Sequence, residues 1–124
     1  MKDKRVNRMG DGDLLERTFD FAVRVIRFLK TIPYSKEHEV IRYQLAQCAP
    51  SVGANSEESQ ASSSKEDFGY KMGVVVREAR ESNDWLRIVK ACKIADGEEL
   101  DALIQESQEL KRIFGSIFAK SKTT

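Results

Sequence analysis

The stretch KEDFGYKMGVVVREARESNDWLRIVKAC, residues 65–92, decides the fold class of this protein. Apolar and small side chains recur along it at spacings of three and four residues, which is the pattern of one face of a long α-helix. This face consists of Phe68, Met72, Val75, Ala79, Ser82, Leu86 and Val89. Ser64 with Asp67 resembles a capping box, and Asp96-Gly97 is a turn signal. The sequence therefore predicts a helix that starts at Ser64 and ends before this turn.

The segments on either side of this helix show the same period. After the turn, one apolar face consists of Leu100, Leu103, Ser107, Leu110, Phe114 and Ile117. Before the helix, another consists of Ile41, Leu45, Cys48 and Val52. Ser35 can cap that earlier helix, and Pro50 lies inside it, where its ring removes a backbone donor and clashes with the carbonyl of Ala46. We expect a kink or a short break near residues 46–50 and a polar connection at residues 59–64.

The first helix carries two neighbouring apolar stripes. One consists of Leu15, Phe19, Ala22, Ile26 and Leu29, and the other of Leu14, Phe21, Val25, Phe28 and Ile32. Asp13 can cap the start of this helix, and Pro33 ends it because the residue before a proline is biased out of the α region. Two stripes form a wider apolar surface than one bundle seam uses, which predicts self-association. The side chains expected between subunits are Phe21, Val25, Phe28 and Trp85.

Four amphipathic helices joined by short loops pack most simply as an antiparallel up-down-up-down four-helix bundle. The fold class is therefore all-α, with residues 1–124 forming one domain and residues 1–12 and 121–124 forming flexible ends. The composition agrees, because 7 Gly and 2 Pro in 124 residues are too few for a turn-rich sheet protein. This topology brings both ends of the chain to the same end of the bundle.

Net charge and cysteine content narrow the functional classes. Lys and Arg number 21 and Asp and Glu number 20, so the net charge of +1 gives no global case for binding nucleic acid or a membrane. Cys48 and Cys92 have no metal-binding spacing, and we expect both to be reduced thiols in the core. The sequence shows neither a signal-peptide pattern nor an apolar run of membrane-spanning length. We therefore expect a cytoplasmic protein that does not bind membranes.

Several short blocks of sequence together resemble a known family. The blocks are Ser51-Val52-Gly53-Ala54-Asn55, Ser64-Lys65-Glu66-Asp67-Phe68, Arg77-Glu78-Ala79-Arg80-Glu81 and Trp85-Leu86. With the start of the first helix at Leu14, they resemble the bacterial four-helix bundle proteins encoded by intervening sequences of 23S ribosomal RNA genes. The resemblance extends to about Val89, and the last helix matches only as a generic amphipathic segment.

The resemblance implies a closed homo-oligomeric ring of antiparallel bundles, expected to be a pentamer, without enzymatic activity. It also implies kinship with the accessory variability determinant proteins of diversity-generating retroelements, which are similar in fold and bind nucleic acid and a reverse transcriptase. Those proteins are strongly basic, whereas this chain is nearly neutral. The partners implied are further copies of the chain, RNA or DNA, and another protein. The family-motif positions with expected structural or interface roles are Phe21, Val25, Phe28, Asn55, Glu58, Phe68, Glu78, Glu81 and Trp85.

The residues provide no set for catalysis, a cofactor or a metal. A ferritin-like di-iron site needs Glu-x-x-His pairs on facing helices. The single histidine, His38, lies in the first turn of the second helix, where we expect it to be solvated. No nucleophile, phosphate loop or Ser/His/Asp set accompanies the acids. We therefore expect a protein without enzymatic activity, cofactor or metal.

Two pairs of polar residues leave alternatives open. Glu78 and Glu81 share one helix face and are either paired carboxylates or, as we favour, salt-bridge partners of a cation on another helix or subunit. The cations considered are Arg24 and Arg42. Asn55 and Glu58 either fasten the second helix to the third, as we favour, or form a polar patch on an assembly interface.

Basic residues are concentrated towards the two ends of the sequence. Residues 1–30 have a net charge of +3 and residues 111–124 of +4, against −6 for residues 31–110. An antiparallel bundle would bring both basic segments to one end, and a ring would repeat that end around its axis. The residues expected to contact phosphates are Arg17, Arg24, Arg27, Lys30, Lys111, Arg112, Lys120 and Lys122.

These features favour a nucleic-acid-associated scaffold or adaptor. Two alternatives remain open. One is that the basic segments are simply solvated chain ends. The other is a protein-interaction hub with no nucleic-acid ligand, which offers a groove to a partner helix.

Overall fold

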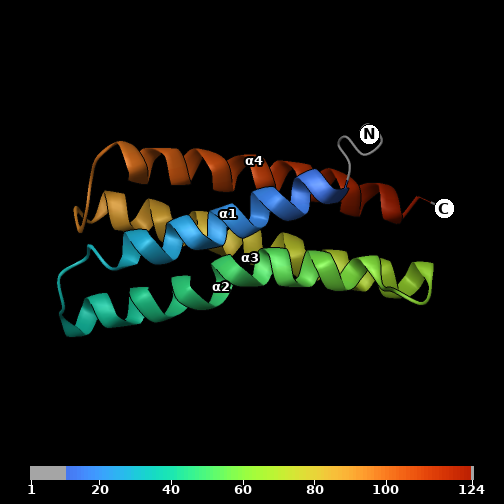
Figure 1. The fold of residues 1–124 in the computed structure, drawn as a ribbon, viewed down its shortest axis with the longest axis horizontal. Helices are drawn as coiled ribbons and strands as arrows, with labels where there is room; N and C mark the ends of the chain where they lie inside the picture. The colour runs from blue at the N-terminus through green and yellow to red at the C-terminus, as the bar shows by residue number, and fades with distance from the viewer. Residues whose placement is uncertain (1–10, 124) are drawn as a thin grey trace.

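Residues 11–123 are described by the structure, a computed structural model. They form four helices and no strand. The helices are α1 (Asp11–Leu29), α2 (Lys36–Gln60), α3 (Lys65–Ala91) and α4 (Glu98–Ser121), as Figure 1 shows. The predicted all-α class and the number of helices are confirmed for this part of the chain. Of the predicted flexible ends, residues 1–10 and 124 lie outside the described residues.

The path of the chain fits an up-down bundle. Figure 1 shows the chain reversing at each connection, so that the start of α1 and the last turn of α4 lie at the same end of the molecule. Around the bundle, α1 packs against α2, α2 against α3, α3 against α4, and α4 against α1. Because α1 and α3 each pack on both α2 and α4, α1 and α3 occupy diagonal corners of the bundle.

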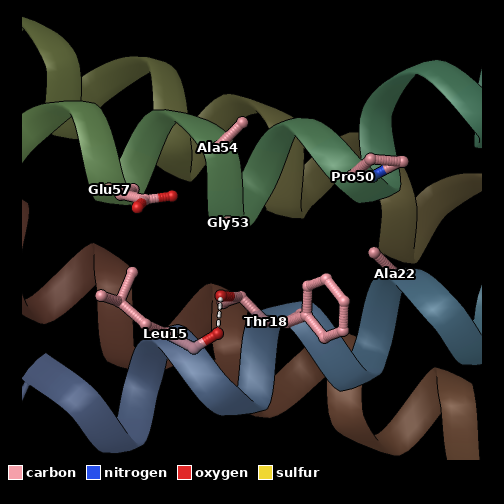
Figure 2. A pocket seen from close by; sticks show the side chains of 8 residues that line it. Leu15, Thr18, Ala22, Pro50, Gly53, Ala54 and Glu57 are labelled. Carbon is pink, nitrogen blue, oxygen red and sulfur yellow. Dashed lines mark hydrogen bonds between the residues drawn. The ribbon is translucent and has the colours of Figure 1, made fainter.

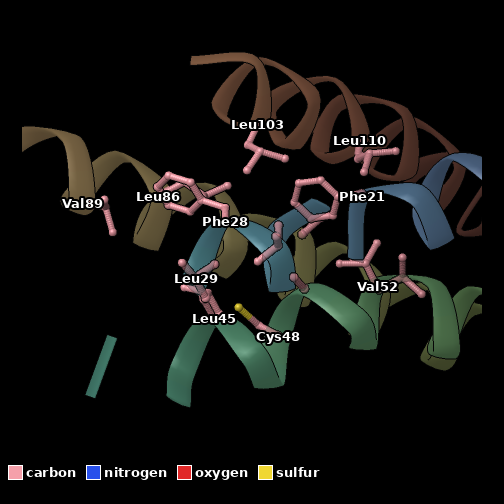
Figure 3. Packing of buried hydrophobic residues seen from close by; sticks show 14 of the residues in the cluster. Phe21, Phe28, Leu29, Leu45, Cys48, Val52, Leu86, Val89, Leu103 and Leu110 are labelled. Atoms are coloured by element: carbon pink, nitrogen blue, oxygen red, sulfur yellow. The ribbon is translucent and has the colours of Figure 1, made fainter. Parts of the chain in front are cut away.

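One hydrophobic core joins all four helices. Figure 3 shows Phe21 and Phe28 of α1 among side chains from the other three helices. The largest side chains that are almost fully buried are Phe21, Phe114, Leu45, Met72, Leu86, Leu100, Leu103 and Leu110. Each contributes about 1.5–3 kcal/mol through burial. The faces predicted for α2, α3 and α4 are therefore confirmed, although Phe68 and Ile117 are only partly buried.

The N-terminal caps of α2 and α3 are the serines that the sequence indicates. The Ser35 hydroxyl accepts a hydrogen bond from the backbone N–H three residues later at 3.1 Å, and the Ser64 hydroxyl accepts one from the Asp67 N–H at 3.0 Å. The Asp67 carboxylate accepts from the N–H of Ser63 at 3.4 Å, one residue earlier than in a standard capping box. A hydrogen bond from Lys71, helped by the one from Ser63, lowers the pKa of Asp67.

Both ends of α1 differ from the prediction. The helix begins at Asp11, so Asp13 lies inside its first turn and is not the cap. It ends at Leu29, four residues before Pro33. The guanidinium of Arg42 donates to the carbonyls of Leu29 and Ile32, which satisfies backbone acceptors that the helix end leaves open. A side chain from α2 therefore holds the end of α1, where the sequence indicated only the proline.

The helix α2 is unbroken, so of the two outcomes expected near residues 46–50, a kink or a short break, the break does not occur. Figure 1 shows a change of direction near the middle of α2, as a kink at its internal Pro50 would produce. One missing backbone hydrogen bond is tolerated because the adjoining turns are anchored in the core by Ala49 and Val52, both fully buried. The helix also extends to Gln60 and buries Ser59, so the connection to α3 is shorter than predicted.

Candidate functional site

The two apolar stripes of α1 face different surroundings. Phe21, Val25 and Phe28 are 1%, 0% and 7% exposed within a single chain. The prediction that they lie between subunits is wrong, because their stripe is the one turned towards α2, α3 and α4 (Figure 3). Trp85, the fourth residue of that set, is half-buried on α3, and its place between subunits stays a prediction.

The last residue of the other predicted stripe, Leu29, is buried in the core. The rest of that stripe, which we call the outer stripe of α1, consists of Leu15, Phe19, Ala22 and Ile26. Within the folded chain Phe19 is 68% exposed and Ile26 is 36% exposed, while Leu15 and Ala22 are half-buried. The surplus of apolar surface that the sequence indicated is therefore present. It lies on the stripe next to the one we expected.

A groove of about 310 Å³ runs between the outer stripe and α2 (Figure 2). This α1–α2 groove is lined by Leu15, Thr18, Phe19, Ala22, Pro50, Gly53, Ala54 and Glu57. The helices come close together along it, since a Cβ added to Gly53 would lie 2.8 Å from the Oγ1 of Thr18. The Thr18 hydroxyl donates to the carbonyl of Leu15 at 3.0 Å, so its polar atom is satisfied within α1. The groove therefore presents mainly carbon atoms, and Glu57 is the one charged residue in its lining.

A second uncovered surface lies on α3 and consists of Glu78, Glu81, Trp85 and Ile88; we call it the α3 face. Ile88 is 39% exposed, and Trp85 packs only partly against the core. Among residues 11–123, neither Glu78 nor Glu81 forms an ion pair. Burial raises the pKa of Glu78, and the nearby charge of Glu81 raises it further. The α3 face thus joins apolar area with two acids that form no ion pair in the described residues, although the nearby charge of Arg77 acts on the pKa of Glu78 in the opposite direction.

The cations that we expected to pair with these acids have other partners. Arg24 contacts Glu99 of α4 at 3.1 Å, and Arg42 holds the end of α1. The predicted pairing is wrong within one chain because α1 lies diagonally across the bundle from α3 and Arg42 points to α1. Pairing of Glu78 and Glu81 with a cation of another subunit stays a prediction.

Three of the predicted phosphate-binding residues are neutralised within the chain. Arg17 forms two hydrogen bonds with the Glu106 carboxylate, at 3.0 and 2.8 Å, and this interaction raises the pKa of Arg17. Arg24 pairs with Glu99, and Arg112 pairs with an acid one turn earlier at 3.1 Å. Paired guanidinium groups contribute less attraction to a phosphate backbone than free ones.

The remaining basic residues do not gather at one end. Arg27, Lys30, Lys111 and Lys120 have no ion pair within residues 11–123, and the Nζ of Lys122 lies 4.5 Å from the ring centroid of Phe118. Arg27 and Lys30 lie at the end of α1, which is opposite to the last turn of α4 in Figure 1. The prediction of a shared basic end is therefore wrong for the basic residues of α1. Those before Asp11 lie outside the described residues.

The last turn of α4 borders a surface hollow of about 320 Å³. Its lining residues are Lys65, Phe68, Ile117, Lys120 and Ser121. The family-motif residue Phe68 is half-buried here, between the core and the hollow. This end of the bundle therefore places lysine side chains beside exposed apolar area.

The pair Asn55 and Glu58 does not fasten α2 to α3. The Asn55 amide donates to the carbonyl of Ser51 in its own helix at 2.9 Å, and the Glu58 side chain is exposed. A buried contact between the two helices is made instead by Ser82, whose hydroxyl lies 3.3 Å from the sulfur of Cys48. The alternative, a polar patch on an assembly interface, stays a prediction.

The sequence and the fold of this chain are similar to those of known proteins. The profile of the 23S rRNA-intervening sequence protein family matches residues 11–116. The chain belongs to this family. A crystal structure from Bacteroides thetaiotaomicron, described as a protein of unknown function from the S23 ribosomal protein family, is similar with a TM-score of 0.78 and 25% identity. The similarity covers 88% of this chain and 97% of that one. No curated protein matched the chain.

The match to the 23S rRNA-intervening sequence protein family extends further than the resemblance in the sequence. It begins with α1 and continues to residue 116 in α4, well past Val89. Both the α1–α2 groove and the α3 face lie inside the matched region.

The histidine and the two cysteines of this chain lie at separate places in the described residues. The Nδ1 of His38 lies 2.7 Å from the carbonyl oxygen of Pro33, so the imidazole is held at the helix start. Cys48 is buried as predicted, but Cys92 is exposed because it follows the last residue of α3. No cluster of three or more His, Cys, Asp or Glu side chains in the described residues can hold a metal ion. None of the described helices has the length and apolar character to cross a membrane.

The prediction from sequence turned the wrong stripe of α1 outwards. One signal was available. Four residues after Ile26 the sequence has Lys30, whereas four residues after Phe28 it has Ile32. The stripe that meets a charged residue at this spacing is the better candidate for the outside of the bundle.

Proposed function

We propose that this protein is a non-enzymatic scaffold that assembles with further copies of itself and binds nucleic acid through the assembly. One observation carries the proposal: the outer stripe of α1 remains uncovered when the chain folds, with Phe19 68% exposed beside a largely apolar groove. Contiguous exposed apolar surface marks a site of protein interaction. Covering it requires a partner, and a further copy of the chain is always present at the same concentration.

The position of the second uncovered surface supports a ring. The outer stripe and the α3 face lie on α1 and α3, at diagonal corners of the bundle. A contact between two different faces of identical chains is heterologous, and it closes into a ring when the rotation between copies allows it. Five copies is the number that the family resemblance implies.

The basic residues near the last turn of α4 support a nucleic-acid ligand. Lys120 lies in this turn and Lys122 directly follows it, and residues 111–124 contain no acid. The start of α1 lies at this same end of the bundle, and the sequence before Asp11 contains Lys2, Lys4, Arg5 and Arg8. A ring would repeat these charges, so that a nearly neutral chain forms a multivalent surface for phosphates. The sequence resemblance implies kinship with the accessory variability determinant proteins, which bind nucleic acid, and the expected location of the scaffold is the cytoplasm.

A protein-interaction hub without nucleic acid is the second candidate. The neutralisation of Arg17, Arg24 and Arg112 by acids of the same chain favours it, because these cations are already paired. In this case the α1–α2 groove would accept the apolar side of a helix from another protein.

Measurement of mass by light scattering, with and without added RNA or single-stranded DNA, tests the proposal. We expect an assembly of fixed size that binds nucleic acid, with an affinity that falls steeply as salt rises. The double variant Lys120→Glu/Lys122→Glu should bind more weakly and with a salt slope smaller by about 2, one for each lysine that no longer reaches a phosphate. The matched control is Lys36→Glu/Arg80→Glu, which makes the same charge change elsewhere.

Three results would oppose the proposal. A monomeric wild type at micromolar concentration would refute the proposed self-association. No binding of RNA or DNA at low salt would refute the nucleic-acid ligand and favour the protein-interaction hub. Equal loss of binding in the Lys120→Glu/Lys122→Glu variant and in its control would show that the last turn of α4 has no special role.

A further inference from the structure

We propose that the two uncovered surfaces bind each other: the α3 face of one copy occupies the α1–α2 groove of the next copy. In this contact the acids of the α3 face lie against Arg27 and Lys30 at the end of α1. The inference rests on the proposed self-association and names the surfaces that make it.

The apolar parts of the two surfaces match in kind. The groove is open, is bordered by the exposed ring of Phe19, and presents small side chains from α2 such as Ala54. Small residues allow a helix to approach closely. The α3 face offers Trp85 and Ile88 one helical turn apart, so both can point into one groove. Aromatic side chains of this kind are enriched among residues that dominate interfaces.

The acids of the α3 face would meet two cations that lie beyond the groove lining, at the end of α1, while the one charged residue of the lining itself is Glu57. Glu78 and Glu81 form no ion pair within residues 11–123, and neither do Arg27 and Lys30 in the same part of the chain. Burial and the neighbouring Glu81 already make the charged form of Glu78 unfavourable, as its raised pKa indicates. A cation from the next copy would relieve that cost. Opposed charges across an interface also fix its register.

The spacing along the two helices agrees when they run antiparallel. Ile88 and Glu78 are ten residues apart, which is about 15 Å at 1.5 Å per residue. Phe19 and Lys30 are eleven residues apart, or about 16.5 Å. With Ile88 beside Phe19, Glu78 therefore reaches Lys30. A parallel arrangement would place the acids at the other end of α1, away from both cations.

Charge reversal tests this contact. Glu78→Lys and Lys30→Glu should each raise the concentration at which half of the assembly dissociates by about tenfold or more, and the double variant should recover most of the loss. The control is Glu66→Lys in the first turn of α3, twelve residues before Glu78 and beyond the end of α1 in this arrangement, which should leave the dissociation unchanged. Light scattering and sedimentation over a dilution series measure the effect, and circular dichroism confirms that each variant is folded.

Tryptophan fluorescence provides a second measurement that needs no variant. Trp85 is the only tryptophan in the chain. Its emission should shift to shorter wavelength over the same concentrations at which the wild type assembles. If the wild type assembles while the Trp85 emission stays constant, or the double variant stays dissociated, the inference is overturned and the self-association stands. If the wild type is a monomer, the proposed scaffold fails as well.

Discussion

Replacing Gly53 by Ala adds one methyl group where α2 comes close to α1. Two effects of opposite sign follow. Alanine in a helix interior is about 1 kcal/mol more favourable than glycine. The new Cβ, however, would lie 2.8 Å from the Oγ1 and 3.1 Å from the Cβ of Thr18. Thr18 is 1% exposed, and its side chain is β-branched with the Cβ fixed to the backbone of α1, so it has little room to move aside. The helices must therefore separate, and such overpacking costs about 1–3 kcal/mol.

The net expectation for Gly53→Ala is therefore a loss of about 0–2 kcal/mol in the free energy of unfolding. Gly115→Ala in α4 is the matched control, because a Cβ added to Gly115 meets no atom within 4 Å. The control should gain about 1 kcal/mol from helix propensity alone. Urea unfolding followed by circular dichroism measures both variants, at one protein concentration because association changes apparent stability. If Gly53→Ala is as stabilising as Gly115→Ala, the close packing of α1 on α2 at this position is wrong.

Three further predictions concern the core and the caps. Ser107→Ala should lower the free energy of unfolding by about 1–3 kcal/mol. The buried amide of Asn83 would lose the Ser107 hydroxyl, its acceptor at 2.9 Å, and keep only the carbonyl of Ile104 at 3.4 Å. Urea unfolding of the variant measures the loss. Asp67→Asn should lower stability at pH 7. The lysine that hydrogen-bonds to this carboxylate lowers its pKa. The stabilisation is therefore present above the ordinary pKa of 3.8 and is lost as pH falls through the lowered value. The free energies of unfolding of the variant and the wild type should converge at the lowest pH at which both remain folded. A thiol reagent should label Cys92 rapidly in the native protein and Cys48 only on unfolding, since Cys48 is buried and its burial raises the pKa of the thiol; labelling of both at one rate would contradict the burial.

Prediction from sequence succeeded where local periodicity and local chemistry decide the outcome. The stripe from Met72 to Val89 is buried as expected, because residues three and four apart share one side of any helix. The caps at Ser35 and Ser64 were also predictable, since each needs only a backbone N–H three residues away. The family resemblance was visible for the same reason, because its blocks lie within single helices or at a cap.

Prediction failed where the outcome depends on which helix lies next to which. The partners of Arg24 and Arg42 come from helices far away in the sequence, and no periodicity within α1 or α2 identifies them. The sequence left a kink and a short break open at Pro50, and the helix continues because neighbouring turns are held in a core that the proline itself does not reveal. Cys92 lies outside the core because α3 ends one residue before it.

The sequence by itself determined four amphipathic helices, the N-terminal caps of the second and third, and an excess of apolar surface on the first, since these depend on spacing along the chain. Only the tertiary structure decided which stripe of α1 is covered. Phe21 and Phe19 are two residues apart and equally apolar, yet one is buried and the other is mostly exposed. A helix can turn either stripe inwards, and the choice is made by the three helices packed around it, because one rotation of α1 fills the space between them.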